Sequence, residues 1–340
     1  NEMSRFTPTT VALALLVGPS AFAATITVDT TADVIDSTGD CSLREAVIAA
    51  NSNAAVYGCA AGDAVGVAVD QILVPAGTYT LAITGTDETW QVGVGTDPYD
   101  VVDQPDTTIG DIDILESAHI MGDGSGNTFV QWGAGEDRIF HVAAVGADDV
   151  LAELTGLTIT GGHVPVEVVN PGDPPDQQWS LRRLGGGVAV GAGGSMKLEG
   201  TTGSDEGNSG PPDVHVSGGD PSLALVDVVI DGNSADGDGG GLFSGGDLTA
   251  QQLVVSNNTC SGNGGGIYHE CDLDLAEVAL LDNTAEGGGA MFMTGGTTGT
   301  IERSLIRGNY AVGGGGLSAR ALVVVELLDT TVAENEAFDV

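Results

Sequence analysis

The last third of the chain repeats itself with a period of 25 to 26 residues, and no other feature constrains the fold as strongly. An asparagine marks each repeat, and the steps between successive asparagines are 25, 25, 26 and 26 residues. The recurring residues are Asn233, Asn258, Asn283, Asn309 and Asn335. A regular period of this size indicates a solenoid, in which each repeat forms one coil.

Two columns of apolar residues appear when the repeats are aligned on this asparagine. They are Leu225, Ala250, Leu275, Ile301 and Leu327 in one column, and Ile230, Val255, Leu280, Ile306 and Val332 in the other. Val228 and Ile230 are two residues apart, which is the side-chain period of a β-strand. A helical repeat is excluded, because the other half of each repeat is rich in glycine.

Glycine runs mark a second corner of each coil, at residues 239–241, 264–266, 287–289 and 313–316. Glycine permits the tight turn that such a corner needs. Stacked coils place equivalent strands about 4.8 Å apart, so each aligned column becomes a ladder. Asparagine tolerates a left-handed backbone, and its amide can hydrogen-bond from coil to coil. We therefore expect an all-β parallel β-helix over residues 81–340, with a structural and not a catalytic asparagine ladder.

The composition supports thin β layers and restricts the partners. Aromatic residues supply only 4% of the chain while glycine contributes 54 residues, so the core must consist of Val, Leu, Ile and Ala. The formal net charge is -39. Such a surface repels polyanions, so nucleic acid and anionic membranes are excluded as partners.

The N-terminus has the pattern of a Sec-type signal peptide over residues 1–23. Arg5 gives a short basic region, Val11 to Val17 form an apolar run, and residues 21–23 (AFA) form a cleavage site. The run is shorter than the roughly 20 residues that span a bilayer. We therefore expect export to the cell surface or medium, without a transmembrane segment.

Four cysteines in an exported chain favour two disulfides, and the sequence-local pairing is Cys41–Cys59 with Cys260–Cys271. Three connectivities remain open. A zinc site would need closer spacing.

Residues 24–80 are expected to cap the open end of the solenoid. Residues 41–53 (CSLREAVIAANSN) predict a helix, with Ser42 and Glu45 as a capping box. Leu43, Val47 and Ala50 share its apolar face.

Residues 41–46 (CSLREA) match the signature of the CSLREA domain of secreted bacterial β-helix proteins. The resemblance continues through residues 70–81, 111–126, 137–142 and 154–163, in the order that family shows. It implies a right-handed, single-stranded, pectin-lyase-like β-helix that is secreted or surface-displayed and adhesin-like, but it implies no single activity. The GGGLF, GGGIY and GGGAMF repeats also resemble those of polymorphic outer-membrane autotransporters.

Two insertions, near residues 163–184 and 201–222, flank a single coil fragment that runs from GGGVAV to KLEG. Insertions in solenoids often carry recognition. Trp179, Arg182 and Arg183 suit sugar or protein contacts and are the candidate ligand-binding residues; the alternative is that they only hold the loop in place.

Calcium is the candidate cofactor, although the chain has no evident requirement for one. Asp231, Asn233, Asp236 and Asp238 concentrate oxygen ligands in one glycine-rich turn. The alternative is a solvated Asp/Gly turn.

The sequence leaves the question of catalysis open. A glycosidase needs two facing carboxylates, which Asp227 with Glu277 or Asp148 with Asp149 could supply, but such pairs arise by chance in so acidic a chain. A lyase needs a base, and Arg303 and Arg307 are better explained as ladder residues. The five histidines show no metal-ligand spacing.

We therefore expect a structural or adhesive module that binds an extracellular polysaccharide or surface protein through side loops and one lateral face. A polysaccharide lyase or glycoside hydrolase is the alternative. End-to-end or lateral self-association is a further expectation. Val340 follows Asn335 by five residues, before the next glycine corner, so we expect the natural protein to continue.

Overall fold

The computed structural model describes residues 24–64, 68–85, 91–92, 101–103, 105–133, 135–145, 148–169, 179–191, 194–198, 214–216 and 220–338. For residues 91–92, 101–103, 166–169, 179–183, 194–198 and 214–216 it describes the backbone alone. The expected signal peptide, residues 1–23, lies outside the described residues.

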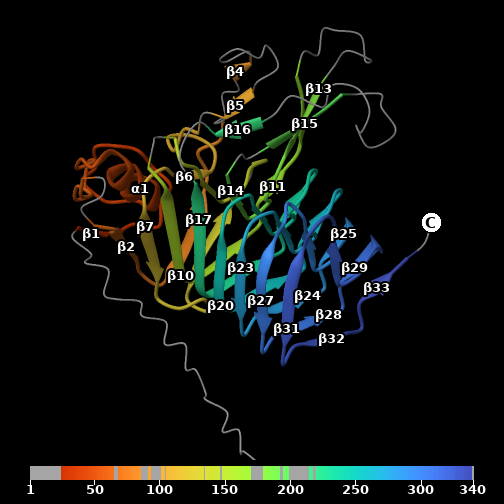
Figure 1. Ribbon diagram of the computed structural model, residues 1–340. Helices are drawn as coiled ribbons and strands as arrows, with labels where there is room; N and C mark the ends of the chain where they lie inside the picture. Colours follow the sequence, from red (N-terminus) through yellow and green to blue (C-terminus); the bar gives the residue numbers. More distant parts are fainter. Residues whose placement is uncertain are drawn as a thin grey trace, which may run out of the picture.

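The chain folds as a right-handed parallel β-helix, as expected, and Figure 1 shows its coils stacked from β2 to β33. A fourteen-stranded sheet forms the largest face. Its main path is β1 (Thr25–Thr27), β2 (Asp70–Val74), β7 (Ala118–Gly122), β10 (Val150–Thr160), β17 (Pro221–Asp231), β20 (Leu248–Ser256), β23 (Leu273–Ala276), β27 (Thr298–Glu302) and β31 (Val324–Leu328). Five more strands extend it, namely β3 (Gly77–Leu81), β8 (Thr128–Trp132), β24 (Ala279–Leu281), β28 (Leu305–Arg307) and β32 (Thr331–Ala333).

Two smaller parallel sheets complete each coil. A six-stranded sheet contains β11 (His163–Val164), β18 (Ser234–Ala235), β21 (Thr259–Cys260), β25 (Thr284–Gly287), β29 (Tyr310–Gly313) and β33 (Glu336–Ala337). A seven-stranded sheet contains β6 (Ile112–Ile114), β9 (Phe140–Val142), β14 (Val188–Val190), β19 (Leu242–Ser244), β22 (Ile267–His269), β26 (Met291–Met293) and β30 (Leu317–Ala319). The inward-facing residues of the sheets form one continuous apolar core.

The asparagine ladder is present and buried. Nδ2 of Asn258 donates to Oδ1 of Asn283 at 3.0 Å, and Nδ2 of Asn283 donates to Oδ1 of Asn309 at 2.9 Å. Each ladder amide also donates to a backbone carbonyl of the preceding coil, such as that of Val255. The left-handed residue is not the asparagine itself but the residue before it, such as Asn257 with φ 55°. The asparagine therefore caps the turn through its side chain, and its own backbone stays unstrained.

A second left-handed position bends the largest face within each coil. It is occupied by Asp227, Gln252, Glu277, Arg303 and Asp329, with φ between 48° and 58°. No glycine stands in this column in the C-terminal coils, and the sequence gives no sign of the bend. In the coil of β10 the same place is taken by Gly156.

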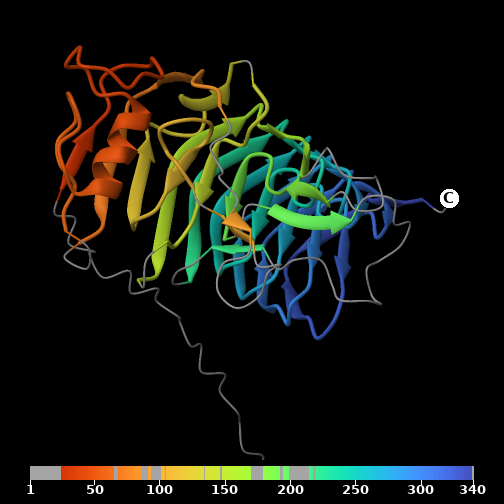
Figure 2. The same ribbon diagram turned by 90° about the horizontal axis from the view of Figure 1, so that it is seen from above.

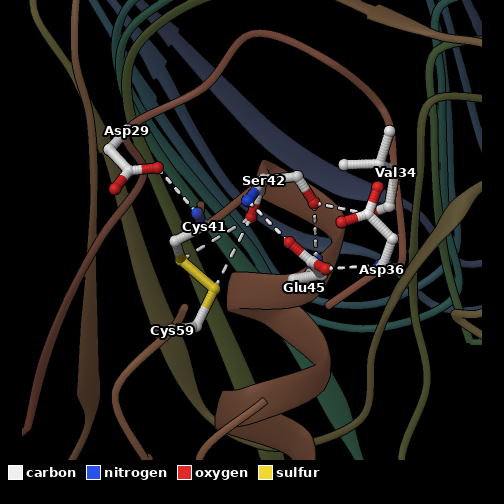
Figure 3. The surroundings of a disulfide bond; sticks show 7 residues. All are labelled: Asp29, Val34, Asp36, Cys41, Ser42, Glu45 and Cys59. Carbon is white, nitrogen blue, oxygen red and sulfur yellow. Dashed lines mark hydrogen bonds between the residues drawn. A yellow bond between two sulfur atoms is a disulfide. The ribbon is translucent and has the colours of Figure 1, made fainter. Parts of the chain in front are cut away.

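The N-terminal cap contains β1 and one helix, α1 (Leu43–Ser52), which begins at the predicted capping box of Ser42 and Glu45. Cys41 and Cys59 form a disulfide beside it, and Figure 3 shows Asp29 accepting the Cys41 amide at 2.6 Å. Strands β2 and β3 already pair in register with β7 and β8. The β-helix therefore begins about ten residues before the boundary expected at residue 80.

The expected Cys260–Cys271 disulfide is wrong, because both residues are free thiols. Cys260 lies on β21 in the six-stranded sheet, where its side chain packs with Val164, Ala235 and Ala285. Cys271 follows β22 of the seven-stranded sheet, and its thiol contacts the Gly245 carbonyl. The two cysteines are close in sequence but belong to different corners of the coil.

Appended strands lie above the body of the β-helix in Figure 1, on the side of β6 and β14, and Figure 2 shows them from above. Antiparallel strands β12 (Val166–Val169), β13 (Trp179–Arg183) and β15 (Gly194–Leu198) form one small sheet. A second contains β4 (Gln91–Val92), β5 (Val101–Asp103) and β16 (Val214–Val216).

Three details of the expected insertions are corrected. The coil fragment holds for β14, but KLEG belongs partly to β15 in the appended sheet. His163 and Val164 lie in the coil as β11, not in the insertion. The segment between β3 and β6, which carries β4 and β5, is a further insertion that the sequence did not indicate. Within the described part of the chain, no helix has the length and apolarity to cross a membrane.

Candidate functional site

One column of side chains points outward along the seven-stranded sheet, because it takes the middle residue of each three-residue strand. Strand register places these residues side by side in successive coils, in the order Asp113, His141, Ala189, Phe243, Tyr268, Phe292 and Ser318. We call this the outer column. Asp113, His141 and Ala189 are fully buried, whereas Tyr268 and Ser318 are partly exposed, so the column opens toward the C-terminal coils.

Three aromatic rings stack in the middle of the outer column. The centroids of Phe243 and Tyr268 are 5.3 Å apart, and those of Tyr268 and Phe292 are 5.4 Å apart, with interplanar angles of 16° and 12°. The guanidinium of Arg320 lies 5.7 Å from the centroid of the Phe292 ring, where a cation–π attraction operates. Since the rings face one another, they present their edges to the surroundings.

Two carboxylates flank the central ring. The Tyr268 hydroxyl donates to Oε1 of Glu270 at 3.0 Å. Burial raises the pKa of Glu270, the hydrogen bond from Tyr268 opposes this, and the charge of Asp238 raises the pKa further. Burial also raises the pKa of Tyr268, and the nearby charges of Glu270 and Asp238 add to the shift. The tyrosine is therefore a neutral donor held between acidic acceptors.

This arrangement offers ring edges, a phenol, two carboxylates and a guanidinium on one partly open face. Carboxylates accept hydrogen bonds from hydroxyl groups, and aromatic residues cover the apolar faces of ligands. We call Asp238, Phe243, Tyr268, Glu270, Phe292 and Arg320 the aromatic face. Its chemistry suits a polyhydroxylated ligand without negative charge, because an anion would meet Asp238 and Glu270.

A shallow groove of about 300 Å³ crosses three coils of the fourteen-stranded sheet. Its lining residues are Asp247, Leu248, Thr249, Asp272, Leu273, Asp274, Thr298, Gly299 and Thr300. Thr298 donates to Oδ1 of Asp272 at 2.6 Å, and Thr300 donates to Asp274. The carboxylates of this groove thus already accept hydrogen bonds from their neighbours in the next coil.

The ligand-binding residues expected in the first insertion lie on one strand. Trp179, Arg182 and Arg183 belong to β13, the central strand of the small antiparallel sheet, and the backbone of Trp179 pairs with Val169 and Leu198. Their side chains lie outside the described residues. Their strand is therefore a rigid element beside the seven-stranded sheet, and not a loop.

The expected calcium turn does not assemble. Asn233 is buried, and its amide donates to Oδ1 of Asn258, so it cannot be a ligand. Asp231 accepts from Ser256 and Asn257, at 2.6 and 2.7 Å. Across the described residues, Asp231, Asp236 and Asp238 do not converge as a possible metal site. The turn satisfies its carboxylates through adjacent coils, which is the plain alternative to calcium.

The residues weighed for catalysis have ladder or turn roles. Asp227 accepts from the hydroxyl of Ser125 at 2.8 Å, and a whole coil that carries Gln252 separates it from Glu277. Arg303 pairs with Glu302 at 2.6 Å and with Glu277 at 3.4 Å. Arg307 pairs with Glu334 at 3.0 Å.

Sequence reasoning missed a buried polar network between the cap and the first coils. The Arg44 guanidinium bonds Asp33 and the backbone carbonyls of Thr107, Gly110 and Asp111. Arg44 and the charge of Asp33 favour the ionised carboxyl of Asp33; although burial is the largest single influence and opposes them, its pKa is lowered overall.

The network continues from Asp111 into the next coil. Oδ2 of Asp111 lies 3.2 Å from Nε of Arg138, and Oδ1 of Asp113 lies 3.1 Å from Nδ1 of His141, all fully buried. The residues come from the stretches 41–46, 111–126 and 137–142, so the motifs that carry the family resemblance meet here. Their common polarity within apolar strands was the available signal.

Comparison with known proteins finds a shared repeat. Residues 227–245 and 252–270 match the repeat of the Chlamydia polymorphic membrane proteins. Each match runs from the end of a long strand, through a ladder asparagine and a glycine corner, to a strand of the seven-stranded sheet. The second match contains Tyr268 and Glu270 of the aromatic face. No curated protein matches the chain.

Two solved structures show a distant likeness, both A-modules of mannuronan C-5 epimerases of Azotobacter vinelandii. The AlgE4 module is 12% identical, with 87% of this chain and 91% of that module covered and a TM-score of 0.26. The AlgE6 module is 12% identical, with 79% and 92% covered and a TM-score of 0.23. We take no function from these enzymes, and the fold stands on its own strand pairing.

Proposed function

We propose that this protein is an exported surface module that binds a neutral glycan on the aromatic face. The observation that carries the proposal is the outward stack of Phe243, Tyr268 and Phe292, with the Tyr268 hydroxyl on Glu270. An outward aromatic stack costs exposure of apolar surface, and the remaining coils fill outward positions with small or polar residues. Such a stack is expected where a ligand covers it.

The charge selects the class of glycan. With a net charge of -39, the protein repels uronic-acid polymers unless cations bridge the two, and Asp238 and Glu270 add local repulsion. A neutral or amino sugar meets no such barrier, because its hydroxyl or ammonium groups donate to these carboxylates.

Export and surface display are supported by the leader pattern and by the repeat shared with the Chlamydia polymorphic membrane proteins. The letters of residues 41–46 support membership of the CSLREA family. The rigid strand β13 beside the seven-stranded sheet extends the binding surface, with Trp179, Arg182 and Arg183 as its contacts.

The test is binding of the secreted chain to a panel of neutral, amino and acidic glycans, followed by titration calorimetry on the best ligand. Tyr268→Phe keeps the ring but removes the donor, and Glu270→Gln removes the charge; we expect each to weaken binding about tenfold. Thr249→Ala, on the fourteen-stranded sheet, is the matched control and should bind like the parent.

Two outcomes contradict the proposal. Equal affinity of the parent and of Tyr268→Phe and Glu270→Gln would place the ligand elsewhere, and preference for uronic-acid polymers would refute the charge argument. The same panel is assayed for new reducing ends and unsaturated sugars. Turnover that depends on Tyr268 or Glu270 would replace the binding module with a glycan-cleaving enzyme.

A further inference from the structure

The buried end of the outer column contains one convergent set of metal-type ligands. Among the described residues, Asp111, Asp113 and His141 form the one group of three whose ligand atoms all lie within 4.8 Å of one another. Asp111 and Asp113 are two residues apart, so both point outward from β6, and strand register places His141 directly beside Asp113. None of the three is accessible to solvent.

The hydrogen bonds of His141 fix its protonation. Nε2 lies 2.7 Å from the Gly191 carbonyl oxygen, which can only accept, so Nε2 carries a proton. In the neutral ring the Nδ1 lone pair then faces Oδ1 of Asp113 at 3.1 Å. A lone pair and a carboxylate oxygen at this distance repel each other unless a cation or a second proton lies between them. A ring N–H donated to a backbone carbonyl is also how metal-bound histidines are oriented.

The charge of the cluster separates these two choices. Asp111, Asp113 and the buried Asp137 carry three negative charges, and Arg138 supplies one positive charge. A second proton on His141 would leave these groups with a net negative charge in a fully buried place. A divalent cation bound by a neutral imidazole brings them to neutrality, which burial strongly favours.

We propose that Asp111, Asp113 and His141 bind one divalent cation, with Nδ1 of His141 and one oxygen of each carboxylate as ligands. The imidazole nitrogen selects a transition-metal ion of the Zn²⁺ class over Ca²⁺ or Mg²⁺, which prefer all-oxygen sites. The ion joins β6 to β9 and, through Gly191, the root of β15. It therefore fastens the appended sheet and the cap-side coils together, and its role is independent of the glycan.

The test uses the mature secreted chain, stripped with EDTA and titrated with Zn²⁺ in millimolar Ca²⁺, which occupies the acidic surface. We expect one tightly bound Zn²⁺ per chain, a higher thermal midpoint after loading, and Co²⁺ absorption bands of a nitrogen-ligated site. Asp113→Asn and His141→Gln should each weaken Zn²⁺ binding by about 100-fold or more. His269→Gln replaces another buried histidine of the same sheet and should leave binding unchanged.

The Co²⁺ spectrum of the parent protein needs no variant, so the proposal stays testable if either substitution prevents folding. Absence of a stoichiometric ion, with a midpoint insensitive to EDTA, would overturn the proposal in favour of the doubly protonated imidazole. Retention of Zn²⁺ by His141→Gln, or binding of Ca²⁺ alone at this place, would also overturn it. None of these results bears on glycan binding.

Discussion

Replacing Asn283 with alanine tests whether the asparagine ladder stabilises the stacked coils. The Asn283 side chain makes four hydrogen bonds: it accepts from the backbone and side-chain amides of Asn258 and donates to the Val255 carbonyl and to Oδ1 of Asn309. Its removal leaves the buried Asn258 N–H without this acceptor, which costs about 1–3 kcal/mol. The lost bond to Val255 adds about 0.5–1.5 kcal/mol. We expect Asn283→Ala to lower the free energy of unfolding by about 2–4 kcal/mol.

Asn335→Ala is the matched control, because the same side chain stands in the same column at the last described coil. Asn335 accepts from Asn309 and donates to the Ile306 carbonyl at 2.8 Å, but it is partly exposed, so water can replace these bonds. We expect it to cost about 1 kcal/mol or less. Urea titrations followed by far-UV circular dichroism give both values. A loss for Asn283→Ala no larger than that for Asn335→Ala would refute a stabilising ladder.

Three further predictions concern the glycine corners, the thiols and pH. A Cβ on Gly265 would lie 2.5 Å from the Thr284 carbonyl oxygen, whereas Ala290 already occupies the position equivalent to Gly266 one coil later, so Gly265→Ala should lower the thermal midpoint clearly more than Gly266→Ala; equal losses would contradict this. Burial raises the pKa of Cys260 to about 12 and that of Cys271 to about 11, so Ellman's reagent at pH 8 should react slowly with the folded chain and count two thiols after unfolding without reductant; a count of zero would restore the second disulfide. Burial lowers the pKa of His269 below 6.5, so the folded chain binds fewer protons than the unfolded chain, and its stability should fall as pH drops through about 6.5, while His269→Gln, compared by thermal midpoint, should lack this component.

The sequence predicted the coils well because identical demands recur in each of them. Ile230, Val255 and Leu280 face one core, and their spacing shows directly in the alignment of repeats. The capping box of Ser42 and Glu45 and the disulfide at Cys41 are local features, set by residues close in the chain. Short-range patterns of this kind need no knowledge of the tertiary structure.

The errors arose where the position within a coil decides the outcome. Cys260 and Cys271 are eleven residues apart, which is less than half a coil, and this distance carries them from one corner to another. The calcium turn failed because Asn233 has an inward ladder role that its acidic neighbours conceal. The segment 194–198 alternates like a coil strand, but β13 offers an antiparallel partner that sequence spacing does not show.

The aromatic face and the buried cluster depend on register between coils. Phe243, Tyr268 and Phe292 are 25 and 24 residues apart, and only the stacking of β19, β22 and β26 brings their rings together. Asp113 and His141 show no ligand spacing along the chain for the same reason. In a solenoid, residues one period apart are neighbours, so a search at the repeat period would have found both sets.

The residues that carry the family resemblance explain why that resemblance is silent about activity. In residues 41–46 no side chain is more than 3% exposed: Cys41 forms the disulfide, Ser42 and Glu45 cap the helix, and Arg44 bonds Asp33 and three carbonyls. No external ligand can reach such letters, so they select for a capped β-helix and leave the outer surface free to vary. Recognition must therefore reside in the partly open positions of the outer column and the appended strands. Substitution of Arg44 should weaken folding without changing the glycan preference of the chains that fold, whereas substitution of Tyr268 should do the reverse.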